Sequence, residues 1–227
     1  MTRWFQSFRY AYEGLVYAYS TQKNMRFHFF AGVIALMLAL YFELSYLEVL
    51  FICLVTCLVI VMELLNTAIE KTIDLTTQEV HPLAKIAKDV AAAAVLVTAV
   101  FAVIVGIVIF YHPIRLWIAG EFVKPHELSV IRIIVVLNLV FLCIMIIQHS
   151  ILKKIKVIEI NIISALNASA LTFVILTDVT SIQILLTCFI SVLVAIGLIG
   201  QKKVKLNSIL LGSFFGMVMT MFIYFLV

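Results

Sequence analysis

The chain has 227 residues, of which 65% are hydrophobic and 12% are charged, and its formal net charge is +4. This is more apolar area than one globular core buries, which excludes a soluble domain. The four cysteines lie scattered in apolar stretches with no zinc spacing and no disulfide framework, so we interpret them as packing residues.

The first segment, "TRWFQSFRYAYEGLVYAYSTQKN", has aromatic residues that recur at helical spacing. Trp4, Phe8, Tyr12 and Tyr19 share one face, while charged and amide side chains take other positions. This pattern predicts an amphipathic helix that lies in the membrane interface, with its aromatic rings at headgroup depth.

The rest of the chain contains apolar segments close to the roughly 20 residues that a spanning helix needs. The first of them is short and begins near His28. They predict an all-α integral membrane protein with the N-terminal surface helix and about seven transmembrane helices. The approximate spans are 27–42, 46–65, 90–111, 131–148, 157–176, 182–200 and 206–227.

The distribution of basic residues predicts the orientation of these spans. With the N-terminus inside, all but three of the 16 lysines and arginines lie on the inner side, and the exceptions are Arg115, Lys124 and Arg132. Inner loops of membrane proteins carry an excess of positive charge. The predicted topology is therefore N-inside and C-outside.

Four polar side chains end the second predicted span. Glu63, Asn66, Glu70 and Asp74 are spaced by three, four and four residues, which places them on one face of a helix. Carboxylates on successive turns suit a hard divalent cation such as Mg²⁺. Lys88 and Asp89 open the third span from the same side, and a lysine there could meet phosphate oxygens as a point charge.

Each of these residues also has a simpler interpretation. Glu70 is then an ordinary interfacial charge, Asp74 stabilises the break before Pro82, and Lys88 and Asp89 form a solvated pair. Glu63 differs, because it lies nearest the hydrocarbon and has no basic residue at helical spacing within the span. Taken as a set, the residues favour a functional site.

The stretch "ELLNTAIEKTID", Glu63–Asp74, resembles the signature of the prokaryotic diacylglycerol kinase family, roughly E-x-x-N-(S/T)-A-(I/L)-E-x-x-x-D. The stretch "HPLAKIAKDVAAAAVL", residues 81–96, is similar to the family's second block, in the form typical of its undecaprenol kinase branch. The N-terminal "FRYAYEGLVYAYSTQKNMRFH" is similar to the family's surface helix. The resemblance covers residues 1–111 and predicts a kinase-like domain there.

The resemblance implies an ATP-dependent lipid kinase in the bacterial plasma membrane, with its active site facing the cytoplasm. Family members are small homotrimers that transfer the γ-phosphate of ATP to a lipid alcohol, using Mg²⁺. The expected partners are the lipid substrate, ATP, membrane lipids and further copies of the chain, and no nucleic acid. Undecaprenol is favoured over diacylglycerol by the form of the second block.

Site residues are carried over from the family by matching position. Glu63 corresponds to the catalytic base that takes the hydroxyl proton, Asn66 supports Glu63, and Glu70 binds the metal ion that bridges the ATP phosphates. The positions implied for binding the nucleotide and its metal are Arg3, Tyr10, Gln22, Glu70, Glu79, His81, Lys88 and Asp89.

Gln22 departs from the family pattern. The chain reads "TQKN" where the family commonly reads "TERN", and that glutamate is a second metal ligand. Glutamine still offers a neutral carbonyl oxygen, but one negative charge is lost. The metal is therefore bound more weakly, or one metal site is absent, or activity has been lost.

Residues 112–227 extend beyond the three-span family unit and resemble no family that we can name. They are predicted to hold four spans and lysine-rich inner loops that contact anionic headgroups. Asn161, Ser164 and Asn167 are interpreted first as interhelical hydrogen-bonding residues, with a ligand site as the alternative. Gly212 and Gly216 form a plausible face for helix contact.

Two other functions remain open. A catalytically weakened kinase that serves as a membrane scaffold is suggested by Gln22. A transporter in which Glu63 and Glu70 line an ion path is less favoured, because the carboxylates cluster at one membrane face.

Overall fold

The computed structural model describes residues 3–76, 81–121, 130–148, 160–177, 181–199 and 205–226. Nearly all of these residues are helical and none of them is in a β-strand, which confirms the all-α class. The helices are α1 (Arg3–Thr21), α2 (Lys23–Tyr41), α3 (Tyr46–Thr76), α4 (Pro82–Ile118), α5 (Val130–Ile147), α7 (Ile162–Leu176), α8 (Ser181–Ile199) and α9 (Leu206–Leu226).

Several helices have the length and hydropathy that a membrane requires. Among the described residues, four helices qualify: Lys23–Tyr41, Tyr46–Thr76, Pro82–Ile118 and Leu206–Phe225. The remaining predicted spans correspond to shorter apolar stretches, Val135–Ile147, Ile162–Leu176 and Gln183–Leu198. The chain is therefore built as a helical membrane protein, while the number and orientation of its spans stay predictions.

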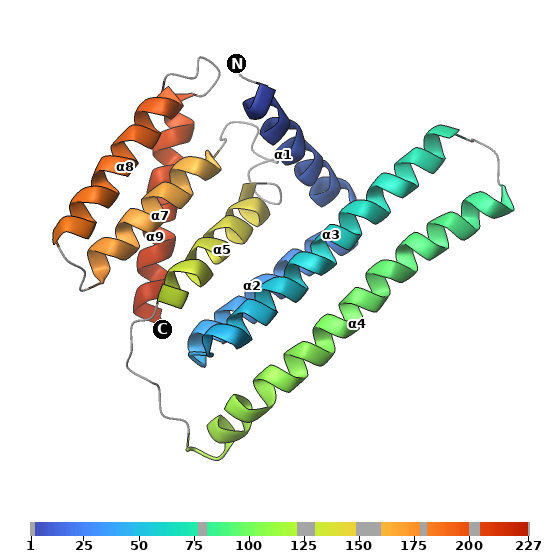
Figure 1. Cartoon of the computed structure of the whole chain (residues 1–227), viewed down its shortest axis with the longest axis horizontal. Helices are drawn as coiled ribbons and strands as arrows, with labels where there is room; N and C mark the ends of the chain where they lie inside the picture. Colours follow the sequence, from blue (N-terminus) through green and yellow to red (C-terminus); the bar gives the residue numbers. More distant parts are fainter. Residues whose placement is uncertain are drawn as a thin grey trace. The chain divides into compact units, whose positions relative to one another are not determined.

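The chain divides into two compact units, which we describe separately. The first consists of Met1–Leu36 and Leu44–Lys124, and the second of Met37–Glu43 and Pro125–Val227. In the first unit α3 and α4 lie side by side along much of their length, and α1 contacts α3 (Figure 1). α4 continues without a break through the end of the predicted third span, from Pro82 to Ile118.

Local chemistry explains where the long helices of the first unit begin. Before α3, the Ser45 hydroxyl donates to Glu48 Oε2 at 2.6 Å and the Ser45 backbone N–H donates to the same oxygen at 2.8 Å, which is half of a capping box. Before α4, His81 Nδ1 accepts from the Leu83 N–H, and Pro82 occupies the first helical turn, where its missing N–H costs nothing.

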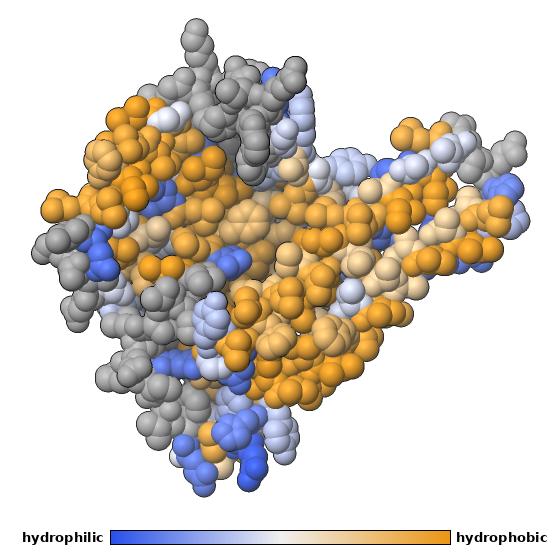
Figure 2. Space-filling model, in the orientation of Figure 1, coloured by the Kyte–Doolittle hydropathy of each residue, from blue (hydrophilic) through white to orange (hydrophobic). Residues whose placement is uncertain are grey.

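The exposed surface of the first unit is strongly apolar. Figure 2 shows hydrophobic residues along α3 and α4, and on α4 they include Val97, Phe101, Ile104 and Val108. Soluble proteins rarely expose contiguous apolar patches of this extent. The α4 surface is therefore suited to contact with lipid or with other membrane helices.

In the second unit α7 packs against α9, α8 and α5. An added Cβ at Gly212 would overlap Ser164 Oγ and the Asn161 carbonyl, and one at Gly216 would overlap the Ala165 carbonyl. Small residues permit this close approach of membrane helices. The prediction that the glycine pair forms a helix-contact face is confirmed.

The predicted fifth span, 157–176, corresponds to α7, but its first three residues lie outside the described residues, and Ile160 and Asn161 precede the helix. Within the described residues the helix begins at Ile162, and Asn161 lies before it as the N-cap, its side chain accepting from the Ser164 N–H at 2.9 Å. Asparagine is favoured there because its side-chain oxygen satisfies a free backbone donor. Ser164 and Asn167 do lie on the helix, and Asn167 hydrogen-bonds Ser191 of α8 as the interhelical interpretation expected.

Candidate functional site

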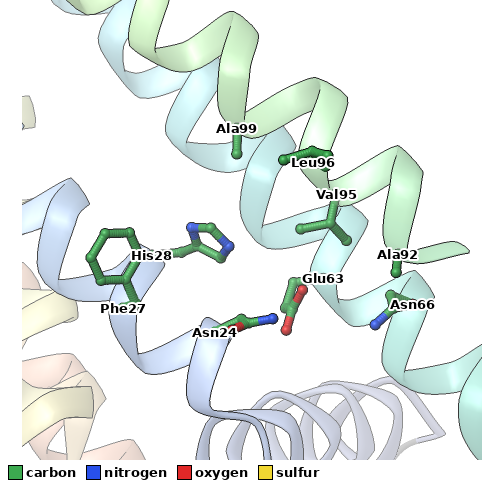
Figure 3. Close-up of a pocket in the computed structure, with 9 residues that line it drawn as sticks. All are labelled: Asn24, Phe27, His28, Glu63, Asn66, Ala92, Val95, Leu96 and Ala99. Atoms are coloured by element: carbon green, nitrogen blue, oxygen red, sulfur yellow. The ribbon is translucent and has the colours of Figure 1, made fainter. Parts of the chain in front are cut away.

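A pocket of about 210 Å³ opens between α2, α3 and α4 of the first unit. Glu63 and Asn66 reach it from α3, while Asn24 and His28 project toward them from α2 (Figure 3). The other lining residues are Phe27 of α2 and Ala92, Val95, Leu96 and Ala99 of α4. The pocket therefore has its polar groups on two helices and an apolar wall on the third.

Glu63 is the buried carboxylate of this pocket, with 1% of its surface exposed. Among the described residues, its Oε2 atom has no hydrogen-bond partner. One turn later, the Thr67 hydroxyl donates to the Glu63 backbone carbonyl at 2.8 Å and not to the carboxylate. A buried polar atom without a partner is costly and calls for an explanation, such as a catalytic role or a bound water or ion.

Asn66 connects the pocket to Glu70, one turn further along α3. Asn66 Nδ2 donates to Glu70 Oε1 at 3.0 Å, and Gln22 Nε2 donates to Glu70 Oε2 at 3.2 Å. Both oxygens of the Glu70 carboxylate thus accept an amide hydrogen. The hydrogen bond from Gln22 ties the junction between α1 and α2 to α3.

Asn66 Oδ1 is buried and lacks a partner in the described structure. Asn66 Oδ1, Gln22 Oε1 and the Glu70 carboxylate would offer oxygen ligands to a metal if the two amides rotated, because both now turn their N–H groups to Glu70. Mg²⁺ accepts such oxygen ligands and keeps several water molecules. As the side chains stand, however, the described residues contain no group of three histidine, cysteine, aspartate or glutamate side chains that could hold a metal.

Lys88 and Asp74 form an ion pair that links α4 to the end of α3. Lys88 Nζ lies 2.6 Å from Asp74 Oδ1, and Lys71 Nζ lies 3.4 Å from Asp74 Oδ2. All three side chains are largely accessible, so that an anion can compete for either lysine. Asp89, beside Lys88, is exposed.

The other predicted nucleotide-binding positions are placed only in part. Tyr10 is 58% exposed on α1, and the guanidinium of Arg9 lies 5.1 Å from the centre of its ring. Arg3 lies at the start of α1, but its side chain is outside the described part, as is the whole of Glu79. His81 serves as the N-cap of α4.

Sequence reasoning did not single out Asn24, His28 or the apolar wall of α4 as site residues. Asn24 and His28 are four residues apart and so share a face at the polar start of an apolar helix. That spacing was a usable signal. It could not show that the face lies opposite Glu63, because the partner is on another helix.

The family described as prokaryotic diacylglycerol kinase matches residues 9–110 of the chain. A diacylglycerol kinase from Synechocystis sp. is 52% identical over 101 residues, which are 44% of this chain and 58% of that protein. An undecaprenol kinase from Bacillus subtilis is 44% identical over 110 residues, which are 48% of this chain and 89% of that protein.

A diacylglycerol kinase from Helicobacter pylori is 37% identical over 99 residues, which are 44% of this chain and 77% of that protein. The matched region thus spans little more than half of the Synechocystis protein but most of the other two. No solved structure matches the chain significantly. Residues 111–227 lie beyond the family match.

Proposed function

The chain belongs to the prokaryotic diacylglycerol kinase family, and from this premise we propose that it transfers the γ-phosphate of ATP to the hydroxyl of a membrane lipid alcohol. The relatives named above, diacylglycerol kinases and an undecaprenol kinase, are lipid kinases. The observation that carries the proposal is Glu63, a buried carboxylate in a pocket that has an apolar wall, with one oxygen that has no partner among the described residues.

Glu63 acts in this proposal as the general base. The lipid hydroxyl oxygen attacks the γ-phosphorus of ATP, and its proton passes to the Glu63 carboxylate. The bond between the γ-phosphorus and the bridging oxygen breaks, and its electrons leave with ADP. Glu63 then returns the proton to water. A positioned base of this kind contributes roughly 10²- to 10⁴-fold to the rate, in addition to the effect of alignment.

The lining of the pocket favours undecaprenol over diacylglycerol as the acceptor. Undecaprenol has one oxygen and a hydrocarbon chain, which match polar groups on α2 and α3 and an apolar wall on α4. Diacylglycerol adds ester carbonyls next to its hydroxyl, and the α4 wall of Ala92, Val95, Leu96 and Ala99 has no side-chain donor to offer them. A buried acceptor without a donor is penalised.

Glu70 is the proposed metal ligand, with carbonyl oxygens from Gln22 and Asn66. When bound, Mg²⁺ would neutralise charge on the ATP phosphates. Glu70 presents a half-buried carboxylate whose two present partners are both rotatable amides. Gln22 supplies no charge, so the set contains a single carboxylate.

Lys88 is the proposed contact for the phosphates, with Asp89, Tyr10, His81, Arg3 and Glu79 as further nucleotide-binding positions. Lys88 is held near the α3 end of the site by Asp74 at 2.6 Å. The Lys88–Asp74 ion pair is accessible to solvent. A polyphosphate also carries more negative charge than the single carboxylate of Asp74. An ATP phosphate therefore competes well for the ammonium group.

The site is proposed to face the cytoplasm from the bacterial plasma membrane, where ATP and the lipid hydroxyl meet. The distribution of basic residues along the sequence supports this orientation. The protein is further proposed to form homo-oligomers, with a trimer as the family-based expectation. Residues 112–227 form a membrane extension to which we assign no catalytic role.

The test is a phosphorylation assay with purified full-length protein, labelled ATP and Mg²⁺, in which undecaprenol and diacylglycerol are offered separately. We expect label on undecaprenol, with less or none on diacylglycerol. Glu63→Gln should lower kcat by about 10²- to 10⁴-fold. Glu13→Gln is the matched control, because Glu13 is an exposed acid on α1 that pairs with Arg9. Label on neither lipid would contradict the proposal.

A weakened kinase retained as a scaffold is the second candidate, and the Gln22–Glu70 hydrogen bond favours it. In that case the wild-type protein labels neither lipid, and Gln22→Glu restores labelling. A transporter is less well supported, because Glu63 and Glu70 both lie in the C-terminal half of α3. Labelling restored by Gln22→Glu would distinguish the weakened kinase from both the active kinase and the transporter.

A further inference from the structure

Asn24 and His28 face the pocket from α2, one helical turn apart, and they lie across from Glu63 (Figure 3). His28 is half-buried and Asn24 is exposed. The family signature in this chain assigns neither residue a role. They are the two hydrogen-bonding side chains that α2 contributes to the lining, beside the apolar ring of Phe27.

The opposite side of the pocket offers acceptors that lack a donor. Glu63 Oε2 and Asn66 Oδ1 are both buried, and neither has a partner in the described part of the chain. A lipid hydroxyl donates its single hydrogen to only one of them. Its oxygen has two lone pairs, and one of these must be free to attack phosphorus.

The second lone pair of the hydroxyl oxygen needs a donor, and α2 supplies it. An imidazole has at least one N–H, and an asparagine amide has two. We propose that His28, assisted by Asn24, is the specificity-determining residue that orients the hydroxyl of a polyprenol-type lipid alcohol against Glu63. The proposal rests on the lipid kinase function proposed above.

In this arrangement the hydroxyl hydrogen and each lone pair of the hydroxyl oxygen have one partner each. The hydroxyl hydrogen points to Glu63 Oε2, one lone pair accepts from His28 or Asn24, and the other points to the γ-phosphorus. The first isoprene units lie against Phe27, Val95 and Leu96. An alcohol with one oxygen brings no further acceptor that needs a donor, and this would discriminate against an ester-bearing lipid.

The kinetic test compares four variants of the full-length protein with undecaprenol and with diacylglycerol. His28→Ala should raise the KM for undecaprenol roughly threefold to tenfold, the effect of one lost hydrogen bond, and leave the KM for ATP unchanged. His28→Gln keeps a donor and should recover part of the loss. Phe30→Leu is the control, because Phe30 is exposed on α2 and does not line the pocket.

Asn24→Ala should shift the undecaprenol KM in the same direction as His28→Ala, and by less. If His28→Ala leaves the undecaprenol KM within about twofold of wild type, the assignment is overturned. It is also overturned if the KM values for ATP and lipid rise together, since that result marks a general distortion of the site.

A second measurement does not depend on turnover. The protein is labelled at its histidines, and the His28 resonance is identified by its loss in His28→Gln. Farnesol, a short polyprenol, is then added in detergent micelles. We expect the His28 signal to shift with farnesol and the shift to weaken in Glu63→Gln. No shift would overturn the proposal even if the enzyme is active. If the His28 signal shifts with farnesol but the protein is inactive, the role of His28 in lipid binding is supported and only the kinase function is contradicted.

Discussion

Gln22 Nε2 donates a hydrogen bond to Glu70 Oε2 across 3.2 Å, between residues that are 48 positions apart in the chain. The junction between the surface helix and α2 is thereby joined to the carboxylate proposed to bind the metal. Asn66 donates to the other oxygen of the same carboxylate. The amide pair holds Glu70 in place with hydrogen bonds, without a second negative charge.

Gln22→Glu should make the site depend on a divalent cation. Two carboxylates at this distance repel each other, so the variant should unfold at a lower temperature than wild type in EDTA. With Mg²⁺ the loss should be recovered, because the cation now has two charged ligands. Mn²⁺ affinity, measured by electron paramagnetic resonance, should rise by about tenfold with the added charge.

Gln6→Glu is the control for this prediction. Gln6 is exposed on α1, so this substitution adds the same negative charge away from Glu70. An unchanged Mn²⁺ affinity in Gln22→Glu would show that Gln22 and Glu70 do not share a metal.

Lys88 and Asp74 should act as one unit in ATP binding. Lys88→Met removes the phosphate contact and should raise the KM for ATP by roughly tenfold to a hundredfold, as expected for a hydrogen bond to a charged group. Asp74→Asn should raise it less, because Lys88 remains but is no longer held at 2.6 Å. The double variant should resemble Lys88→Met alone, since the two effects share one interaction.

The matched control is Lys85→Met, because Lys85 is an exposed lysine one turn before Lys88 on α4. Additive effects of Lys88→Met and Asp74→Asn on the KM would mean that the ion pair and the nucleotide site are independent.

Gly216→Val should destabilise the second unit. Even a Cβ at this position overlaps the Ala165 carbonyl of α7, so α9 has to move away from its partner. Overpacking of this kind costs about 1–3 kcal/mol, which should lower the midpoint of thermal unfolding in micelles. Gly197→Val is the control, because a Cβ at Gly197 meets nothing within 4 Å. Equal shifts in the two variants would exclude close packing as the cause.

The Ser169–Thr220 hydrogen bond should contribute modestly to the α7–α9 contact. Ser169 Oγ and Thr220 Oγ1 are 2.6 Å apart and both residues are fully buried. In membrane proteins such bonds average about 0.6 kcal/mol in double-mutant cycles. A cycle of Ser169→Ala and Thr220→Val, read by unfolding, should return a coupling energy of about that size. A coupling energy of zero would show that the Ser169–Thr220 hydrogen bond adds nothing beyond packing.

Much of the first unit was predictable because its signals are local. The spacing of Glu63, Asn66 and Glu70 predicted one helical face, and α3 does run unbroken from Tyr46 to Thr76. The predicted break before Pro82 is consistent with α3 ending at Thr76 and α4 beginning at Pro82, eight residues before the predicted third span. The family resemblance, carried by two blocks in residues 63–96, is confirmed by the match over residues 9–110.

Other features could not be read from the chain, because they depend on contacts between helices. His28 was noted only as the polar start of a span, and no periodicity within α2 indicates that it faces Glu63. His81 was expected near the nucleotide, and only the structure reveals its nitrogen capping α4. Asn161 was read as part of a span although it caps α7, because a residue at a helix end fits either assignment.

The sequence by itself determined that this is an apolar helical chain and to which family its first half belongs. These properties follow from composition and from spacing within single helices. Only the tertiary structure decided that Gln22 meets Glu70, that Lys88 meets Asp74, and that His28 lines the same pocket as a Glu63 oxygen without a partner in the described segments. Hydrogen bonds and ion pairs act over a few ångströms, so their partners are set by how the helices pack and not by their order in the chain.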